Sequence, residues 1–184
     1  MRQSFRRAGL LTAAFLLALA GMMALTGTAS ATKSQKTLRV ASVTQACEVS
    51  ICARDAVTIP SGTRVDTYCA HPNGQLNLTY TGPVTGRGGY IPIGNFQNPN
   101  VNTETCGSFS GSFARARVET SLGSCSGPCV NFGRVLAGDQ LRAFCHLPPN
   151  RPEWLLVYST RNTNAGFVRV STLDINPAVP SCNG

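Results

Sequence analysis

Hydrophobic and polar residues alternate over two stretches of the chain that each follow a glycine turn. In residues 63–69, after the turn at Pro60-Ser61-Gly62, apolar residues and threonines alternate with charged and aromatic residues. Residues 140–145 repeat this pattern after a second glycine turn. A period of two is typical of a half-buried strand. Because no segment after residue 31 has the period of a helix, the pattern predicts an all-β fold of short strands.

The chain contains the same unit twice. Each cysteine of the first half has a counterpart in the second half, at offsets of 78, 77, 76 and 76 residues. The first set is Cys47, Cys52, Cys69 and Cys106, and the second set is Cys125, Cys129, Cys145 and Cys182. Other residues follow the same register, since Gly89-Tyr90-Ile91 aligns with Gly166-Phe167-Val168. The repeat predicts two domains of about 70 residues each.

The next predicted strand differs between the two repeats. Residues 76–80 have apolar side chains on one face and two polar side chains on the other, whereas residues 154–158 are apolar on both faces. The additional apolar face consists of Leu155 and Val157. Because such a face is unfavourable in water, we expect it to contact the first repeat, so that the repeats pack together. If it instead fills the interior of the second repeat, the repeats are expected to move independently.

The first 31 residues have the features of an export signal. Arginines within residues 2–7 precede an apolar stretch at 10–25, and Ala29-Ser30-Ala31 forms a small-residue cleavage site. A transmembrane anchor is the alternative, but the apolar stretch is shorter than the roughly 20 residues of a spanning helix. We therefore expect residues 1–31 to be a signal peptide. The mature protein is then secreted, and is extracellular or associated with the cell wall, without a membrane attachment.

The mature chain carries a modest positive charge. Without the three arginines of the signal, 13 basic and 8 acidic residues give a net charge of +5, and the basic residues are scattered. A dispersed basic surface is attracted weakly to anionic polymers such as cell-wall teichoic acids. Nucleic-acid binding is not expected, because the chain has no basic cluster.

The second repeat carries a series of motifs in the order of a known small domain. They are Ser126-Gly127-Pro128 in a loop, Gly138-Asp139 before a strand, Trp154, Gly166-Phe167-Val168, and a closing Ser171-Thr172-Leu173. This sequence resembles the bacterial SH3-like domain, in particular its small secreted actinobacterial type. The resemblance implies two tandem SH3-like β-barrels, at residues 37–107 and 113–183, each stapled by two disulfides. The first repeat departs from the motif, since Leu76 replaces the tryptophan and Ala53-Arg54-Asp55 stands near the loop.

All eight cysteines are expected to form disulfides, because small exported domains depend on such links. If both repeats pair identically, three pairings remain. The equal interval of 37 residues between the third and fourth cysteine of each set favours a link between these two, in agreement with the resemblance. The favoured pairs are then Cys47–Cys52, Cys69–Cys106, Cys125–Cys129 and Cys145–Cys182. A zinc site that uses Cys125, Cys129, Cys145 and His146 is the alternative, which export and the duplication of every cysteine disfavour. We expect no metal and no other cofactor.

No catalytic set is recognisable in the sequence, so we expect no enzymatic activity. With all cysteines in disulfides, no thiol is left as a nucleophile, and neither His71 nor His146 accompanies a serine nucleophile motif. The eight carboxylates are scattered along the chain. The two histidines follow the third cysteine of their sets and are interpreted as residues of surface loops, with a paired functional role as the alternative.

Four residues are candidates for ligand contact. Tyr68 and Phe144 occupy the same place in the two repeats, on the charged face of the first predicted strand, where Phe144 lies near Arg142. Exposed aromatic residues beside charged residues are typical of binding surfaces, and burial by the neighbouring repeat is the alternative. Trp154 is the fourth candidate, and its register with Leu76 also fits a core residue.

The hypothesis from the sequence is a secreted, non-enzymatic binding protein. Through tandem SH3-like domains it would recognise peptides or polymers of the cell envelope, as the resemblance, the export signal and the mild basic charge suggest. The alternative is a disulfide-stapled protein-interaction module, such as an inhibitor, a toxin or a structural surface protein. In that case the loop at residues 148–152 would be presented to an extracellular protein.

Overall fold

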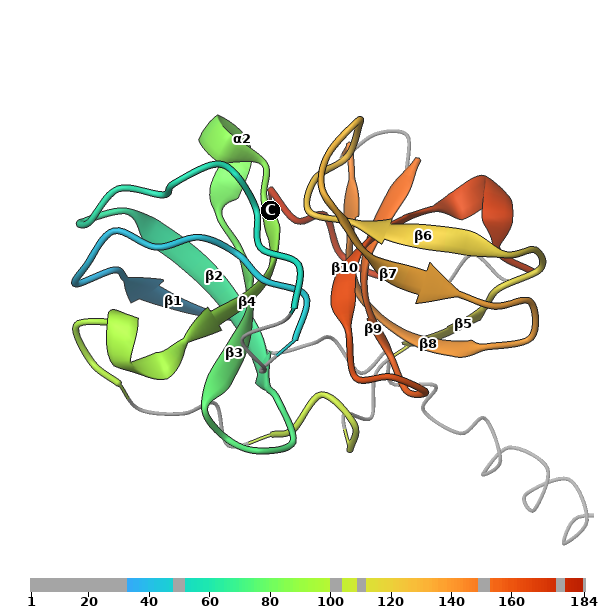
Figure 1. The fold of residues 1–184 in the computed structure, drawn as a ribbon, viewed down its shortest axis with the longest axis horizontal. Coiled ribbons are helices and arrows are strands. Elements are labelled where there is room, and N and C mark those ends of the chain that lie inside the picture. The colour runs from blue at the N-terminus through green and yellow to red at the C-terminus, as the bar shows by residue number, and fades with distance from the viewer. Residues whose placement is uncertain are drawn as a thin grey trace, which may run out of the picture.

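The computed structural model describes residues 33–47, 52–99, 104–108, 112–148, 153–174 and 178–183. In these residues almost all regular structure is antiparallel strand, arranged in two sheets that lie side by side (Figure 1). The exceptions are the helical turn α2 (Gly82–Thr85) and the 3-10 turns η2 (Ile93–Asn95) and η3 (Val170–Thr172). The all-β fold class is therefore confirmed. No helix of the described residues is long and apolar enough to cross a membrane.

Each sheet is built from the strands of one repeat. The first sheet contains, in spatial order, β1 (Ser34–Thr37), β2 (Arg64–Ala70), β3 (Leu76–Tyr80) and β4 (Gly88–Pro92). The second sheet has the order β5-β8-β9-β10-β6-β7. Its strands are β5 (Ser112–Arg115), β6 (Thr120–Gly123), β7 (Asn131–Val135), β8 (Gln140–Leu147), β9 (Trp154–Ser159) and β10 (Ala165–Arg169).

The two repeats share one topology, although two strands of the second repeat are represented by isolated bridges in the first. β6 pairs with β7, whereas the equivalent segments of the first repeat pair at Gln45 and Arg54. The bridge between Gln45 and Tyr90 corresponds to the pairing of Gly123 with Phe167. The repeat in the cysteine spacing is therefore also a repeat of the strand pairing.

The cysteines pair as their intervals predict. The four disulfides are Cys47–Cys52, Cys69–Cys106, Cys125–Cys129 and Cys145–Cys182, and no cysteine is free. Each long link joins a strand to a tail that runs parallel to it, with bridges from Ala70 to Thr105 and from His146 to Ser181. The cysteines are thus bonded to each other, and the zinc alternative was wrong.

The two sheets share one hydrophobic core, which we call the seam core. It consists of buried residues from both repeats, many of them in equivalent positions. They are Tyr68, Cys69, Leu76, Leu78, Tyr80, Tyr90 and Cys106 from the first repeat, and Phe144, Cys145, Leu147, Leu156, Tyr158, Ala165, Phe167 and Cys182 from the second. All four tyrosines of the chain belong to it. The repeats therefore pack together.

Backbone hydrogen bonds cross the seam in two equivalent places. The Gly88 N–H donates to the Ser124 carbonyl at 2.8 Å, and the Ala165 N–H donates to the Ala46 carbonyl at 3.2 Å. Because the repeat register relates Gly88 to Ala165 and Ser124 to Ala46, each repeat contacts the other with the same surface. This reciprocal contact is the geometry of a two-fold symmetric dimer, realised here within one chain.

Leu155 and Val157 do not form the contact between the repeats, so that expectation was wrong. Both are fully buried in a second cluster that belongs mainly to the second repeat and includes Leu122, Phe132 and Leu141. The opposite face of β9 supplies the residues of the seam core. The repeats pack together for a different reason. The opposite face of this strand is apolar in both repeats, and the apolar face of each repeat is covered by the other repeat.

Candidate functional site

The candidates Tyr68 and Phe144 are buried, with 3% and 0% exposure, and their ring centroids lie 5.8 Å apart across the seam. The expected exposure was wrong, and burial by the neighbouring repeat is what the structure shows. A register shift at Tyr68 in β2 and at Phe144 in β8 breaks the period of two on which the expectation depended. Burial, reinforced by the charge of Asp66, raises the pKa of Tyr68 far above its ordinary value.

The other two candidates, Arg142 and Trp154, are half-buried and stack against different partners. The guanidinium carbon of Arg142 lies 4.3 Å from the ring centroid of Phe113, a residue that the sequence did not single out. Trp154 packs against the seam core, and its ring lies 5.1 Å from the guanidinium carbon of Arg169. The four candidates therefore do not form one site.

The histidines occupy structural positions. His71 directly follows β2 and is buried, with its ring edge-on to Tyr90 and its Nδ1 2.8 Å from Asn73 Oδ1. The surface-loop interpretation was wrong for His71, because the seam core covers it. His146 lies within β8, with Nδ1 3.2 Å from the Pro148 carbonyl. Within the described residues, no three His, Cys, Asp or Glu side chains are grouped as they would be at a metal site.

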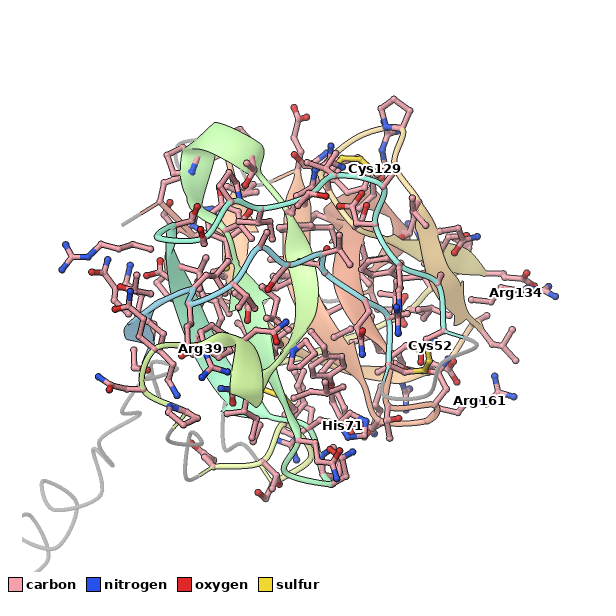
Figure 2. The ribbon with its side chains drawn as sticks, turned by 60° about the vertical axis from the view of Figure 1, so that its left-hand side comes forward. Arg39, Cys52, His71, Cys129, Arg134 and Arg161 are labelled. Carbon is pink, nitrogen blue, oxygen red and sulfur yellow. A yellow bond between two sulfur atoms is a disulfide. The ribbon has the colours of Figure 1, made fainter. Side chains whose placement is uncertain are left out.

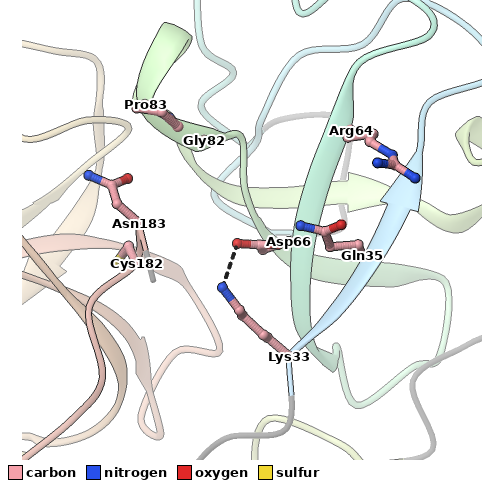
Figure 3. A pocket seen from close by; sticks show the side chains of 8 residues that line it. All are labelled: Lys33, Gln35, Arg64, Asp66, Gly82, Pro83, Cys182 and Asn183. Atoms are coloured by element: carbon pink, nitrogen blue, oxygen red, sulfur yellow. Dashed lines mark hydrogen bonds and ion pairs between the residues drawn. The ribbon is translucent and has the colours of Figure 1, made fainter.

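A polar pocket of about 210 Å³ opens where the two repeats meet, and we call it the seam pocket (Figure 3). Strands β1 and β2 form one wall, the turn α2 lies above it, and the tail of the second repeat closes the other side. Its lining residues are Lys33, Gln35, Arg64, Asp66, Gly82, Pro83, Cys182 and Asn183. Because it needs side chains from both halves of the chain, neither repeat contains this pocket alone.

Charges of both signs line the seam pocket. Lys33 Nζ lies 3.4 Å from Asp66 Oδ2, and the Asp66 side chain is only 12% exposed. Asp66 lies opposite Tyr80 in the sheet, and the Tyr80 hydroxyl donates to Asn183 Oδ1 at 2.7 Å. Burial, reinforced by the charge of Asp66, raises the pKa of Tyr80 to about 12. Tyr80 therefore remains a hydrogen-bond donor at neutral pH and holds the tail of the second repeat against the first.

Arg87 connects the two repeats at another side of the seam. Its Nη1 lies 3.4 Å from the buried Asp55 carboxylate and donates to Cys129 Sγ at 3.3 Å. Cys129 belongs to the disulfide loop at the top of the second repeat in Figure 2. The second repeat has Asn164 in the position of Arg87, so this charged link has no counterpart there. It fixes the second repeat's disulfide loop against the first repeat.

A second hollow lies over β5 and β8, and we call it the outer groove. It has a volume of about 370 Å³ and is lined by Phe113, Ala114, Arg115, Gln140 and Asp174. Phe113 is 47% exposed, and the sequence analysis did not identify it. In the register of the repeat Phe113 corresponds to Gln35, but the sequence does not mark either residue as lining a hollow.

Several arginines lie outside both hollows. Arg134 and Arg161 project from the edge of the second repeat in Figure 2, where they pair with Glu119 and Asp139. Arg39 lies on the first repeat and donates to the Gly94 carbonyl at 2.9 Å. These residues make up part of the scattered basic charge and offer controls for substitutions within the hollows.

Comparisons with known proteins give no family for this chain. No family model matches it, and no curated protein matches it. Among solved structures, a match was found to NlpC2 from Trichomonas vaginalis, with 12% sequence identity and a TM-score of 0.31. The match covers 79% of this chain and 49% of that protein, so the chain spans about half of its length. A TM-score this low carries no argument about fold or function.

Proposed function

We propose that this chain is an exported, non-enzymatic binding protein whose tandem SH3-like repeats recognise peptides or polymers of the cell envelope. The observation that carries the proposal is the seam pocket, a polar hollow to which both repeats contribute. The four disulfides agree with an oxidising compartment outside the cytoplasm, to which an export signal would direct the chain.

The lining of the seam pocket favours a ligand end group that carries both charges. Lys33 and Arg64 can donate to a carboxylate, and Asp66 can accept from an ammonium group. The pocket is smaller than the roughly 300–1,000 Å³ of sites that enclose a drug-sized ligand. It therefore suits the end of a longer molecule. Envelope peptides with a free amine and a free carboxylate have such ends.

The test is retention of the mature protein on purified peptidoglycan at physiological salt, compared with a soluble protein of equal net charge. Arg64→Gln and Asp66→Asn change the seam pocket, and Arg134→Gln removes one positive charge from an exposed site outside it. We expect Arg64→Gln and Asp66→Asn each to weaken binding by about tenfold, as for the loss of one hydrogen bond to a charged group. Arg134→Gln should bind like the original protein.

The outcomes separate the two functions considered for this chain. No retention of the original protein on peptidoglycan would refute the proposal. Equal losses for Arg64→Gln and Arg134→Gln would show that binding follows net charge and not the seam pocket. Cross-linking in culture fluid that captures a single protein partner, without wall fragments, would favour the protein-interaction alternative.

A further inference from the structure

Phe113 is an exposed aromatic residue in the outer groove. Its side chain is 47% exposed, and among the described residues it is the only aromatic residue with large exposure. The other exposed large hydrophobic residues are Val40 and Val118, which occupy equivalent positions in the two repeats and do not line either hollow. Phe113 therefore differs from ordinary surface apolar residues because it lines a groove.

The ring of Phe113 is held in a defined orientation. Phe113 in β5 lies opposite Arg142 in β8, and the Arg142 guanidinium carbon is 4.3 Å from the ring centroid. The guanidinium covers one face of the ring by a cation–π contact. The exposed part of the side chain is then the edge and the opposite face of the ring. A flat apolar surface is thus presented from a strand and not from a mobile tip.

Polar side chains surround this surface. Arg115 and Gln140 lie opposite each other on β5 and β8, and the Asp174 N–H donates to the Arg115 carbonyl at 2.9 Å. The groove therefore offers guanidinium and amide donors together with amide and carboxylate acceptors. Ala114, the next residue of β5, points to the opposite face and is buried in the interior of the second repeat. The exposed aromatic ring of Phe113 thus lies next to hydrogen-bond donors and acceptors. This arrangement suits a ligand that has an apolar face and several hydroxyl groups.

We propose that the outer groove is a saccharide-binding site in which a pyranose ring of a sugar polymer stacks on Phe113. The C–H groups on one face of a pyranose carry a slight positive charge, and an aromatic face is negative. Ring hydroxyls both donate and accept, as the side chains of Arg115, Gln140 and Asp174 require. The volume of about 370 Å³ is at the lower end of the range for ligand sites, so the groove suits one or two rings.

The inference goes beyond the end group proposed for the seam pocket and does not depend on it. The equivalent of Phe113 in the first repeat is Gln35, which lines the seam pocket. The two repeats thus place different chemistry at the same position on their first strand. Only the second repeat has the aromatic plate, and we expect one saccharide site per chain.

The experiment is a calorimetric titration of the mature protein with chitotetraose, an uncharged tetramer of N-acetylglucosamine that contains no peptide. Phe113→Ala removes the plate, Phe113→Trp keeps an aromatic plate, and Val118→Ala removes an apolar side chain of equal exposure (46%) outside the groove. We expect saturable binding at one site, about five- to tenfold weaker binding for Phe113→Ala, and little change for the other two variants.

Three results would overturn the inference: no saturable binding by the original protein, equal affinity of Phe113→Ala, or equal losses for Phe113→Ala and Val118→Ala. If Phe113→Ala does not fold, chitotetraose is titrated into the original protein while the amide resonances of Arg115 and Gln140 are followed. A tetramer of glycerol units, which should not bind, is the reference. Resonances that respond no more to chitotetraose than to this reference would overturn the inference. Retention on peptidoglycan without chitotetraose binding would refute this site alone. Chitotetraose binding without an effect of Arg64→Gln on retention would refute the seam-pocket proposal alone.

Discussion

Substitution of Gly88 by alanine tests whether the two repeats depend on one shared core. Gly88 begins β4 in the first repeat. A Cβ atom at this position would lie 2.6 Å from Phe167 Cε2 and 2.7 Å from Leu156 Cδ1, both in the second repeat. Phe167 and Leu156 are fully buried in the seam core, so they have little room to move. One methyl group on the first repeat would therefore strain the second.

The expected cost follows from packing. An extra methyl group in a well-packed core costs about 1–3 kcal/mol. Gly94→Ala is the matched control, since Gly94 lies in η2 and a Cβ there would have no atom within 4 Å. That change should be neutral or stabilising by about 0.4–1 kcal/mol, because alanine restricts the unfolded chain. We expect Gly88→Ala to be less stable than Gly94→Ala by about 2 kcal/mol, which is roughly 4–8 °C in Tm.

The assay is urea unfolding followed by tyrosine near-ultraviolet circular dichroism and by fluorescence of Trp154. All four tyrosines lie in the seam core and the tryptophan packs against it, so both signals report on the contact between the repeats. A single transition that moves to lower urea in Gly88→Ala supports the shared core. Equal stability of Gly88→Ala and Gly94→Ala would refute the reasoning, as would two separate transitions in the original protein.

Two further predictions concern the seam and the interior of the second repeat. The pKa of Tyr80 is raised from 10.0 to about 12 in the folded protein, so Tyr80 ionises at lower pH in the unfolded chain than in the folded one. The contribution of Tyr80 to the free energy of unfolding should therefore be fully present below pH 10 and be lost as the pH rises to about 12. Tyrosinate absorbance should therefore increase together with unfolding, and ionisation of Tyr80 near pH 10 in a folded protein would contradict this. Leu155→Asn should destabilise the protein by about 3 kcal/mol or more in urea unfolding, because it loses apolar burial and adds an unpaired amide. Leu155→Met is the control, and equal midpoints for Leu155→Asn and Leu155→Met would contradict the assignment of Leu155 to the interior.

The features that could be predicted are those encoded by spacing along the chain. The duplicated cysteine intervals predicted the repeat and all four disulfides, because a disulfide fixes which residues meet regardless of the details of packing. Alternation predicted strands where β2 and β8 occur. Tyr90 and Phe167, which the register of the repeat aligns, both lie in the seam core.

The features that the sequence analysis missed depend on which face of a strand is buried, and on whether the same repeat or the other repeat covers that face. A bulge inserts one residue and reverses the alternation that follows it, which is why Tyr68 and Phe144 could not be assigned to a face from the pattern. Leu155 and Val157 also misled, because an apolar position is equally suited to the interior of a repeat and to a contact between repeats. Asn77 and Thr79, their equivalents, are fully buried as well. The polar residues of the first repeat therefore did not indicate that this face of the strand is exposed in either repeat.

The comparison of equivalent positions separates residues that maintain the fold from those that give each repeat its own chemistry. Leu78 and Leu156 agree in chemical type and lie in the seam core, where the near two-fold geometry imposes the same environment twice. At the two hollows the repeats differ. Asp66 in the seam pocket corresponds to Arg142 beside the outer groove, so the charge is reversed at the same place on β2 and β8. A symmetric frame alone would produce two identical sites. Because the reversal falls beside the hollows and not in the core, the same fold presents a different surface to a ligand in each repeat.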